Sequence, residues 1–414
     1  MPVVLPISPR QRSDEPRPPR AIVWLALFVV VMFAGVAGTL LTWPKAEPTG
    51  TPWFWVQLFA LPALGWALAF GLRLHYYDEE VVRQEAEDEV LREDRAKAIR
   101  FASEPLAVVG LSYLCGAGPE DVAKKIAQGE TALAAKTSQD GKSGKRHTSL
   151  PLVDNEDGMG RYGSCFESLL TRVGPAIMAL PQDVALDVRL HLPDDERREL
   201  RLQAWHQCWS KSELRPAPTT LIPVGQGLMA LDEWLDIKGG PSLERFVLFV
   251  SAQLHDVPPD NSAEAAVALL LGWAPLAERR GIRPLAMMHR PLAVETGLLD
   301  DAIQLALLWG KTTPAQVTDL WQAAMLGEDK GVILQKASDT KLAVSQTTEL
   351  AGIRDIDTAL GNPGVCAGWL AAALAIEHAE QTGAPQILVW RERNLHLAVV
   401  QPAAVSRQQT ELKA

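Results

Sequence analysis

The four cysteines are the first candidates for chemistry in this chain, because a thiolate is a strong nucleophile and a metal ligand. Cys115, Cys165, Cys208 and Cys366 lie far apart, with neither Cys-x-x-Cys spacing nor a nearby pair of histidines. The sequence therefore predicts no metal site and no disulfide framework. Cys165, in the segment GRYGSCFESLL ahead of a helical stretch, is the one thiol that we keep as a candidate nucleophile. Its alternative role is that of most lone cysteines, a small buried hydrophobic side chain.

Other catalytic and binding motifs are missing from the sequence. It contains no GxSxG, GxGxxG or P-loop spacing, so neither hydrolase chemistry nor a nucleotide or dinucleotide cofactor has local support. The formal net charge is -10, and no block is rich in lysine and arginine. A surface of this charge repels phosphate backbones, so we expect no nucleic-acid partner.

The elements that must position any site begin at about Phe101, where apolar runs of strand type alternate with amphipathic stretches of helix type. This alternation predicts an α/β layered domain. The polar segment Thr137–Thr148 (TSQDGKSGKRHT) is expected to be a mobile loop. We expect strands at Leu106–Leu111, Phe246–Ser251, Ala265–Leu271, Ile387–Trp390 and Leu395–Val400, and helices at Glu120–Gln128, Gly225–Asp236, Leu298–Trp309, Pro314–Leu326 and Ala367–Glu380.

Two segments without charge precede this domain, at Ala21–Trp43 and Pro52–Leu72. Each is long enough, at about 1.5 Å per residue, to cross roughly 30 Å of hydrocarbon. Aromatic residues at the ends of the second segment are typical of membrane interfaces. Four arginines precede the first segment and six basic residues follow the second up to Arg100, whereas the connecting loop has only Lys45. Basic residues stay on the cytoplasmic side, so both ends of the chain are expected in the cytoplasm.

The sequence thus predicts five parts. They are a basic cytoplasmic tail over residues 1–20, transmembrane helices over 21–43 and 52–72, a charged helical linker over 73–101 and a cytoplasmic domain over 102–414. The linker is rich in Glu, Arg and Ala and has no Gly or Pro between Tyr76 and Arg100, which favours one solvated helix.

Five segments of the domain resemble β-ketoacyl synthases, in the order in which that family has them. PLAVVGLSYLCGAGPEDVAKKIAQGETAL resembles the opening strand, turn and helix, and GQGLMALDEWLD with LERFVLFVSAQL resembles the nucleophile helix and the next strand. NSAEAAVALLLG is similar to a small-residue turn and strand, GNPGVCAGWLAAALAIEHA to the glycine turn and helix that carry a histidine, and ILVWRERNLHLAVVQP to the closing hairpin. The resemblance covers residues 105–402 and implies the thiolase-like fold, a five-layered α/β/α/β/α sandwich of two similar halves that pairs as a homodimer.

The residues that this family uses for condensation are not retained. The resemblance places the nucleophile at Val224 and one histidine at Asn362, and no histidine occurs between His289 and His378, where the other is expected. Valine cannot attack a thioester, and asparagine cannot exchange protons. The resemblance therefore implies the fold without a catalytic residue, a cofactor or a metal.

The sequence leaves three functions open. The preferred one is a non-catalytic binding platform. Its membrane anchor and cytoplasmic domain resemble accessory and lipase adaptor proteins of bacterial type VI secretion, which implies the inner membrane and a secretion effector or spike protein as partner. The second is an acyl-carrier or lipid-binding partner of an active synthase, which needs a deep apolar tunnel. The third is an atypical acyltransferase, which needs a cleft at Cys165 with a proton acceptor.

Overall fold

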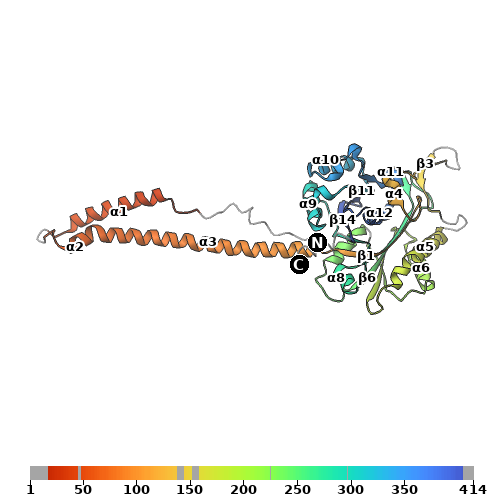
Figure 1. Ribbon diagram of the computed structural model, residues 1–414, viewed down its shortest axis with the longest axis horizontal. Coiled ribbons are helices and arrows are strands. Elements are labelled where there is room, and N and C mark those ends of the chain that lie inside the picture. The colour runs from red at the N-terminus through yellow and green to blue at the C-terminus, as the bar shows by residue number, and fades with distance from the viewer. Residues whose placement is uncertain are drawn as a thin grey trace. The chain divides into compact units, whose positions relative to one another are not determined.

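The computed structural model describes residues 17–44, 48–137, 144–151, 158–223, 225–295 and 297–403. The chain divides into two compact units, one within residues 4–98 and a larger one from Ile99 onward. Figure 1 shows the ribbon of both units, with many of the helices and strands labelled.

The smaller unit is a helical hairpin. Two of its helical stretches, Ala21–Thr42 and Pro52–Ala102, contain a segment long and apolar enough to cross a membrane. The second stretch joins the predicted transmembrane segment and the predicted charged linker in one continuous helix. Its parts are α2 (Pro52–Trp55), the π-helical turn η2 (Val56–Ala60) and α3 (Leu61–Ala102), and the first stretch is α1 (Ala21–Thr42).

The two helices of the hairpin approach closely where a glycine faces a proline. A Cβ atom at Gly35 would collide with the Pro62 ring. Pro62 has no N–H and displaces the carbonyl four residues earlier, which accounts for the π-helical turn just before it. Thr39 Oγ1 donates to the Gly35 carbonyl at 2.9 Å and to the Gln57 carbonyl at 3.3 Å, and Trp66 Nε1 donates to the backbone of α1 at 3.0 Å. These hydrogen bonds pair polar side chains with backbone carbonyls inside the hairpin.

The larger unit is built on a mixed sheet of eleven strands among the described residues. The first half of the unit contributes β1 (Leu106–Cys115), β4 (Ala185–His191), β5 (Thr219–Leu221), β6 (Arg245–Gln253) and β8 (Ala265–Trp273). The second half contributes β9 (Ala286–Met288), β11 (Asp319–Ala323), β12 (Ile353–Asp355), β13 (Gln386–Arg391) and β14 (Leu395–Pro402), with β10 (Leu292–Ala293) beside β14. A smaller sheet holds β2 (Ala135–Thr137), β3 (Gly144–Thr148) and β7 (Ser262–Ala263).

The two halves repeat one plan. Their orders, β5-β4-β6-β8-β1 and β12-β11-β13-β14-β9, both place the third, second, fourth, fifth and first strand of the half side by side. The directions agree as well, because the first three strands in each order are parallel and the last two join antiparallel. The halves meet where β1 pairs antiparallel with β9.

Helices complete five layers. Outer helices cover one face of each half-sheet (Figure 1), and central helices fill the space between the halves. Three separate hydrophobic clusters correspond to the two outer interfaces and the central one, so the predicted α/β/α/β/α sandwich is confirmed. The outer helices are α5 (Gly158–Met178), α6 (Arg198–Lys211), α9 (Leu299–Trp309) and α10 (Gly327–Asp339). In the central layer, the first half has η3 (Gly227–Met229) and α7 (Ala230–Leu235). The second half has α11 (Ile356–Ala359), η7 (Gly364–Cys366) and α12 (Ala367–Thr382). Two short helices, α4 (Val122–Ala127) and α8 (Ala274–Arg279), follow β1 and β8.

The two central helices differ in length. α12 is buried on all sides, as its Ala-rich sequence favours, because small side chains let both half-sheets approach one helix. A Cβ atom at Gly368 would lie 2.9 Å from Trp390 Cδ1. In the first half, α7 has only six residues, and Gly239, Gly240 and Pro241 follow shortly after it. The layer between the halves therefore depends mainly on α12.

Most of the strands and helices predicted from the sequence are present in the structure, but one predicted helix and one predicted loop are not. The five predicted strands are confirmed as β1, β6, β8, β13 and β14. The helix predicted over Pro314–Leu326 is wrong, because this segment contains the buried strand β11, which pairs in parallel with β12 and β13. The loop predicted over Thr137–Thr148 is wrong at its ends, which belong to β2 and β3, and residues 138–143 lie outside the described residues.

Candidate functional site

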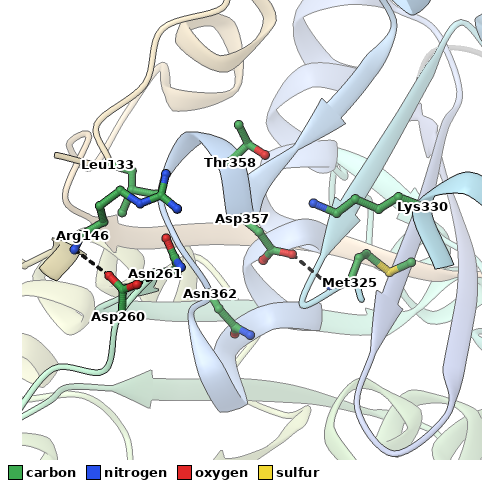
Figure 2. Close-up of a pocket in the computed structure, with 9 residues that line it drawn as sticks. All are labelled: Leu133, Arg146, Asp260, Asn261, Met325, Lys330, Asp357, Thr358 and Asn362. Atoms are coloured by element: carbon green, nitrogen blue, oxygen red, sulfur yellow. Dashed lines mark hydrogen bonds between the residues drawn. The ribbon is translucent and has the colours of Figure 1, made fainter. Parts of the chain in front are cut away.

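A cavity of about 360 Å³ lies beside Asn362, in the turn ahead of α12. Figure 2 shows the side chains that surround it. They come from both halves of the larger unit, so the cavity depends on the complete fold. The lining residues are Leu133 after α4, Arg146 in β3, Asp260 and Asn261 ahead of β7, Met325 after β11, Lys330 in α10, Asp357 and Thr358 in α11, and Asn362.

Backbone contacts hold Asn362 in place. The Asn362 N–H donates to the Asn261 carbonyl at 2.8 Å, and the Asn362 carbonyl accepts the Ala263 N–H at 2.8 Å. Gly361 has a φ of +98°, and a Cβ atom there would lie 2.5 Å from the Ser262 carbonyl oxygen. Only glycine fits this close, left-handed turn. The glycine turn visible in the sequence therefore docks a second-half residue against the first half.

The Asn362 side chain offers hydrogen bonds but no acid–base chemistry. Its Oδ1 accepts the Gly364 N–H at 2.9 Å, which leaves the amide NH₂ as the group available to a ligand. Asn362 is exposed to solvent. Neither a cysteine nor a histidine is among the residues that line this cavity. The second histidine of the family resemblance therefore has no counterpart in the lining.

The carboxylates of the cavity are held by backbone and amide N–H groups. Asp357 accepts the N–H groups of Ala324 and Met325 at 2.9 and 2.8 Å. Burial raises the pKa of Asp357. Asp260 accepts the Arg146 N–H at 2.8 Å and the Asn261 amide at 3.2 Å. Each of these carboxylate oxygens thus already has a donor from the protein.

Val224, the position to which the resemblance assigns the nucleophile, lies outside the described residues. The helix that follows it is covered by the tip of the β13–β14 hairpin. A Cβ atom at Gly227, whose φ is +42°, would collide with the Glu392 carboxylate, and one at Gly225 would lie 3.0 Å from Arg393 Nε. Burial raises the pKa of Glu392, while a hydrogen bond from the Leu228 N–H opposes the rise. A protein carboxylate therefore already occupies the start of η3.

The candidate thiol at Cys165 lies elsewhere. It is inside α5, fully buried in the outer layer of the first half, and it does not line the cavity. Burial raises the pKa of its thiol, which disfavours the nucleophilic thiolate. Cys366, at the end of η7, is also fully buried, and burial raises its pKa to about 12. Full burial leaves neither thiol in a cleft that a substrate could enter, which an acyltransferase needs.

A serine–histidine pair that no sequence motif predicted lies near the cavity. His147 Nδ1 is 2.8 Å from Ser262 Oγ, and the two residues are 115 positions apart in the chain. The Ser262 hydroxyl donates to the Pro259 carbonyl at 2.6 Å, so its proton is not directed at the imidazole. This pair ties β3 to β7 and does not have the arrangement of an activated nucleophile. Among the described residues, no group of His, Cys, Asp and Glu has the geometry of a metal site.

Comparison with known proteins identifies the fold. No family model matches the chain, and no curated protein matches it in sequence. Ketosynthase twelve of the bacillaene polyketide synthase from Bacillus amyloliquefaciens matches in structure with a TM-score of 0.54 and 12% identity, over 73% of this chain and 74% of that chain. The fold is thiolase-like.

Two further ketosynthase structures agree with this assignment. An oxazolomycin ketosynthase domain from Streptomyces albus has a TM-score of 0.50 and 13% identity, over 72% of this chain and 95% of that chain. A type II polyketide ketosynthase in complex with its acyl-carrier protein has a TM-score of 0.50 and 11% identity, over 72% and 99% of the two chains. At these identities the likeness establishes the architecture, and the function must be argued from the residues of the site.

Proposed function

We propose that this protein is a membrane-anchored, non-catalytic ketosynthase-like protein that acts as a binding platform. The observation that carries the proposal is the cavity at Asn362, which offers hydrogen-bond donors but neither a thiol nor an imidazole in its lining. Val224 supplies no nucleophile, and the Cys165 thiol is buried away from the cavity. Decarboxylative condensation needs a thiolate and donors for the developing oxyanion, and the first of these requirements is not met.

The surroundings of α12 do not favour the lipid-binding alternative. The central core is filled by large side chains, among them Trp234, Trp321, Trp369 and Trp390, each of which is at most 1% exposed. The cavity at Asn362 is lined mainly by polar and charged residues. An acyl chain needs a continuous apolar channel, and these residues do not provide one.

The membrane anchor is part of this proposal. None of the most apolar window of α1 is buried inside the protein, and Leu25, Val30 and Phe33 are exposed. Exposed apolar surface on this scale favours a lipid environment. With basic residues on both flanks of the hairpin, the larger unit would lie in the cytoplasm, at the inner membrane of a bacterium.

Mass spectrometry of the intact protein tests the absence of catalysis. The full chain in detergent is incubated with acetyl-, malonyl- and long-chain acyl-CoA, next to an active ketosynthase as positive control. We expect no acyl adduct on this protein, because burial raises the pKa of all four thiols and so disfavours the thiolate. An adduct that disappears in the C165S variant would overturn the proposal and establish an acyltransferase.

The finer proposal is an adaptor role in type VI secretion. Its support is the combination of a membrane hairpin with a cytoplasmic domain of degenerate enzyme fold. The full chain carrying an affinity tag is crosslinked in its native cells, and the captured proteins are identified. We expect a secretion effector or a spike protein. Capture of none of the secretion components would exclude this role, and the mass of the solubilised particle would show whether two copies pair.

A further inference from the structure

We propose that the cavity at Asn362 binds one oxyanion group, a carboxylate or a phosphate ester, at the end of its ligand. This inference rests on the proposed function and names the chemistry that the platform recognises. It follows from the balance of hydrogen-bond donors and acceptors around the cavity, because every strong acceptor already has a donor and several donors have no acceptor.

Arg146 supplies the principal free donor group. Its backbone N–H is used by Asp260, but its guanidinium has no acceptor among the described residues, and the side chain is exposed at the cavity. A guanidinium presents paired N–H groups that match the two oxygens of a carboxylate or phosphate. Because none of the described carboxylates pairs with it, the guanidinium is available to a ligand.

Lys330 and Asn362 add further donors. Lys330 Nζ donates to Asp355 Oδ2 at 2.5 Å, which uses one of its three hydrogens. The Asn362 amide NH₂ has no acceptor among the described residues. In Figure 2, Arg146 and Lys330 lie on opposite sides of the cavity, with Asp357 between them. A ligand that enters between them therefore meets donors from both halves of the unit.

The acceptors of the cavity argue against a cation as the ligand. Both oxygens of Asp357 and both oxygens of Asp260 accept hydrogen bonds from the protein. The described residues also contain no cluster of metal-ligating side chains. A cation would share carboxylate oxygens that already accept one hydrogen bond each, whereas an anion uses donors that have no acceptor among the described residues.

The charges of the lining limit the size of the anion. Arg146 and Lys330 are offset by Asp260 and Asp357, so the lining has no formal excess of positive charge. A polyanion gains little from such a surface, because its additional charges would meet carboxylates. Directed hydrogen bonds to one oxyanion group are what the site offers.

Thermal unfolding of the full chain in detergent micelles tests the inference. Inorganic phosphate and succinate are added separately at fixed pH, and potassium chloride at equal ionic strength serves as the reference, since it removes general salt effects. A ligand that binds only the folded state raises the midpoint of unfolding. We expect phosphate, succinate or both to raise it above the chloride reference. A response to one of them alone would assign the ligand to phosphate esters or to carboxylates.

Substitutions test whether the anion binds at the cavity. Arg146→Gln is expected to weaken the affinity for the responsive anion about tenfold or more, because a charge-assisted hydrogen bond is lost. Arg283→Gln is the matched control, since Arg283 is also exposed, has no partner among the described residues and lies outside the cavity lining. Asn362→Ala gives a second, weaker reduction.

Two outcomes would overturn the inference: no response to either anion, or an equal response in R146Q and wild type. The acylation and crosslinking experiments are repeated on R146Q, so the two proposals can fail separately. If R146Q binds no anion but still captures its partner, the oxyanion is not what the platform recognises. The oxyanion inference alone is then wrong. An acyl adduct on wild type would remove the proposed function instead.

Discussion

At the scale of single residues, Gly227 and Glu392 show how the tip of the β13–β14 hairpin packs on the start of a helix in the other half. The hairpin tip brings a carboxylate to the start of η3, where no side chain at Gly227 can stand. Burial raises the pKa of Glu392, and a hydrogen bond from the Leu228 N–H at the start of this helix opposes the rise. This contact is thus built from one glycine and one acid that lie in different halves of the unit.

Gly227→Ala is expected to destabilise the protein by about 3 kcal/mol, because it combines a left-handed backbone with a collision. Gly129→Ala is the matched control, since Gly129 has a φ of +81° but open space around its Cβ position, and it should cost about 1 kcal/mol. Glu392→Ala in the G227A background removes the collision. It should therefore bring the loss of stability down to that of G129A. Chemical denaturation measures each protein, and equal losses for G227A and G129A would contradict this account.

Three buried histidines make the larger unit sensitive to acid. Burial lowers the pKa of His289 to about 3 and the pKa values of His191 and His396 to about 4. The unfolded chain binds protons below about pH 6.5, whereas these folded residues do not, so stability is present above that pH and falls as the pH is lowered.

The expected slope approaches about 1.4 kcal/mol per pH unit for each histidine between about pH 6 and the folded pKa values. Denaturation midpoints at about pH 7, 6 and 5 measure it. His396→Gln should reduce the slope, and His206→Gln, at an exposed position, should leave it unchanged. A midpoint that does not fall over this range would show that these imidazoles are not buried as described.

At the scale of elements, α12 is the helix on which the sandwich depends. Trp369 stacks on Phe249 with ring centroids 5.3 Å apart, and its Nε1 donates to His191 Nδ1 at 3.1 Å. Both partners belong to strands of the first half, whereas α12 belongs to the second. One side chain therefore links the two halves through packing and a hydrogen bond.

Trp369→Ala should lower the free energy of unfolding by about 3 to 5 kcal/mol, because it leaves a large cavity between the two half-sheets. Trp209→Ala on α6 is the control, since Trp209 is only partly buried, and it should cost clearly less. Equal costs for the two variants would indicate that the central layer is not the main source of stability.

The elements with the clearest sequence patterns were predictable, and those that depend on tertiary contacts were not. The runs that form β6 and β8 are apolar over almost their whole length, as strands buried on both faces require. β11 was not predictable, because DLWQA is short and has the spacing of an amphipathic helix, and its two parallel neighbours decide its conformation.

The site was predictable only in part. The family resemblance led to Asn362, as the position of a histidine that is not retained, because a glycine turn before an apolar helix is visible in the sequence. Arg146, Asp260 and Lys330 could not be found in this way, because they come from separate elements and only the folded chain brings them together. Distances between segments far apart in sequence leave no local pattern.

At the scale of the whole molecule, the loop between the two hairpin helices is expected outside the cytoplasm, and the larger unit is expected inside it. Alkaline phosphatase inserted at Gly50, in the loop between the helices, should be active, because this loop is expected outside the cytoplasm, where its disulfides form. A fluorescent protein at the C-terminus should fluoresce. Phosphatase joined instead after Arg100 should be inactive, and activity there would reverse the predicted orientation.

The repeated strand order has a consequence for how such a protein can evolve. Each half-sheet is held by its own ladders, and the candidate site lies at the joint between the halves, outside those ladders. Reactive side chains at a joint of this kind contribute to chemistry more than to stability. Replacing them therefore lowers the stability of the fold only slightly. Under the proposed function, the repeated scaffold persists without the condensation reaction, and the cavity at the joint is a place where a new binding partner can be selected.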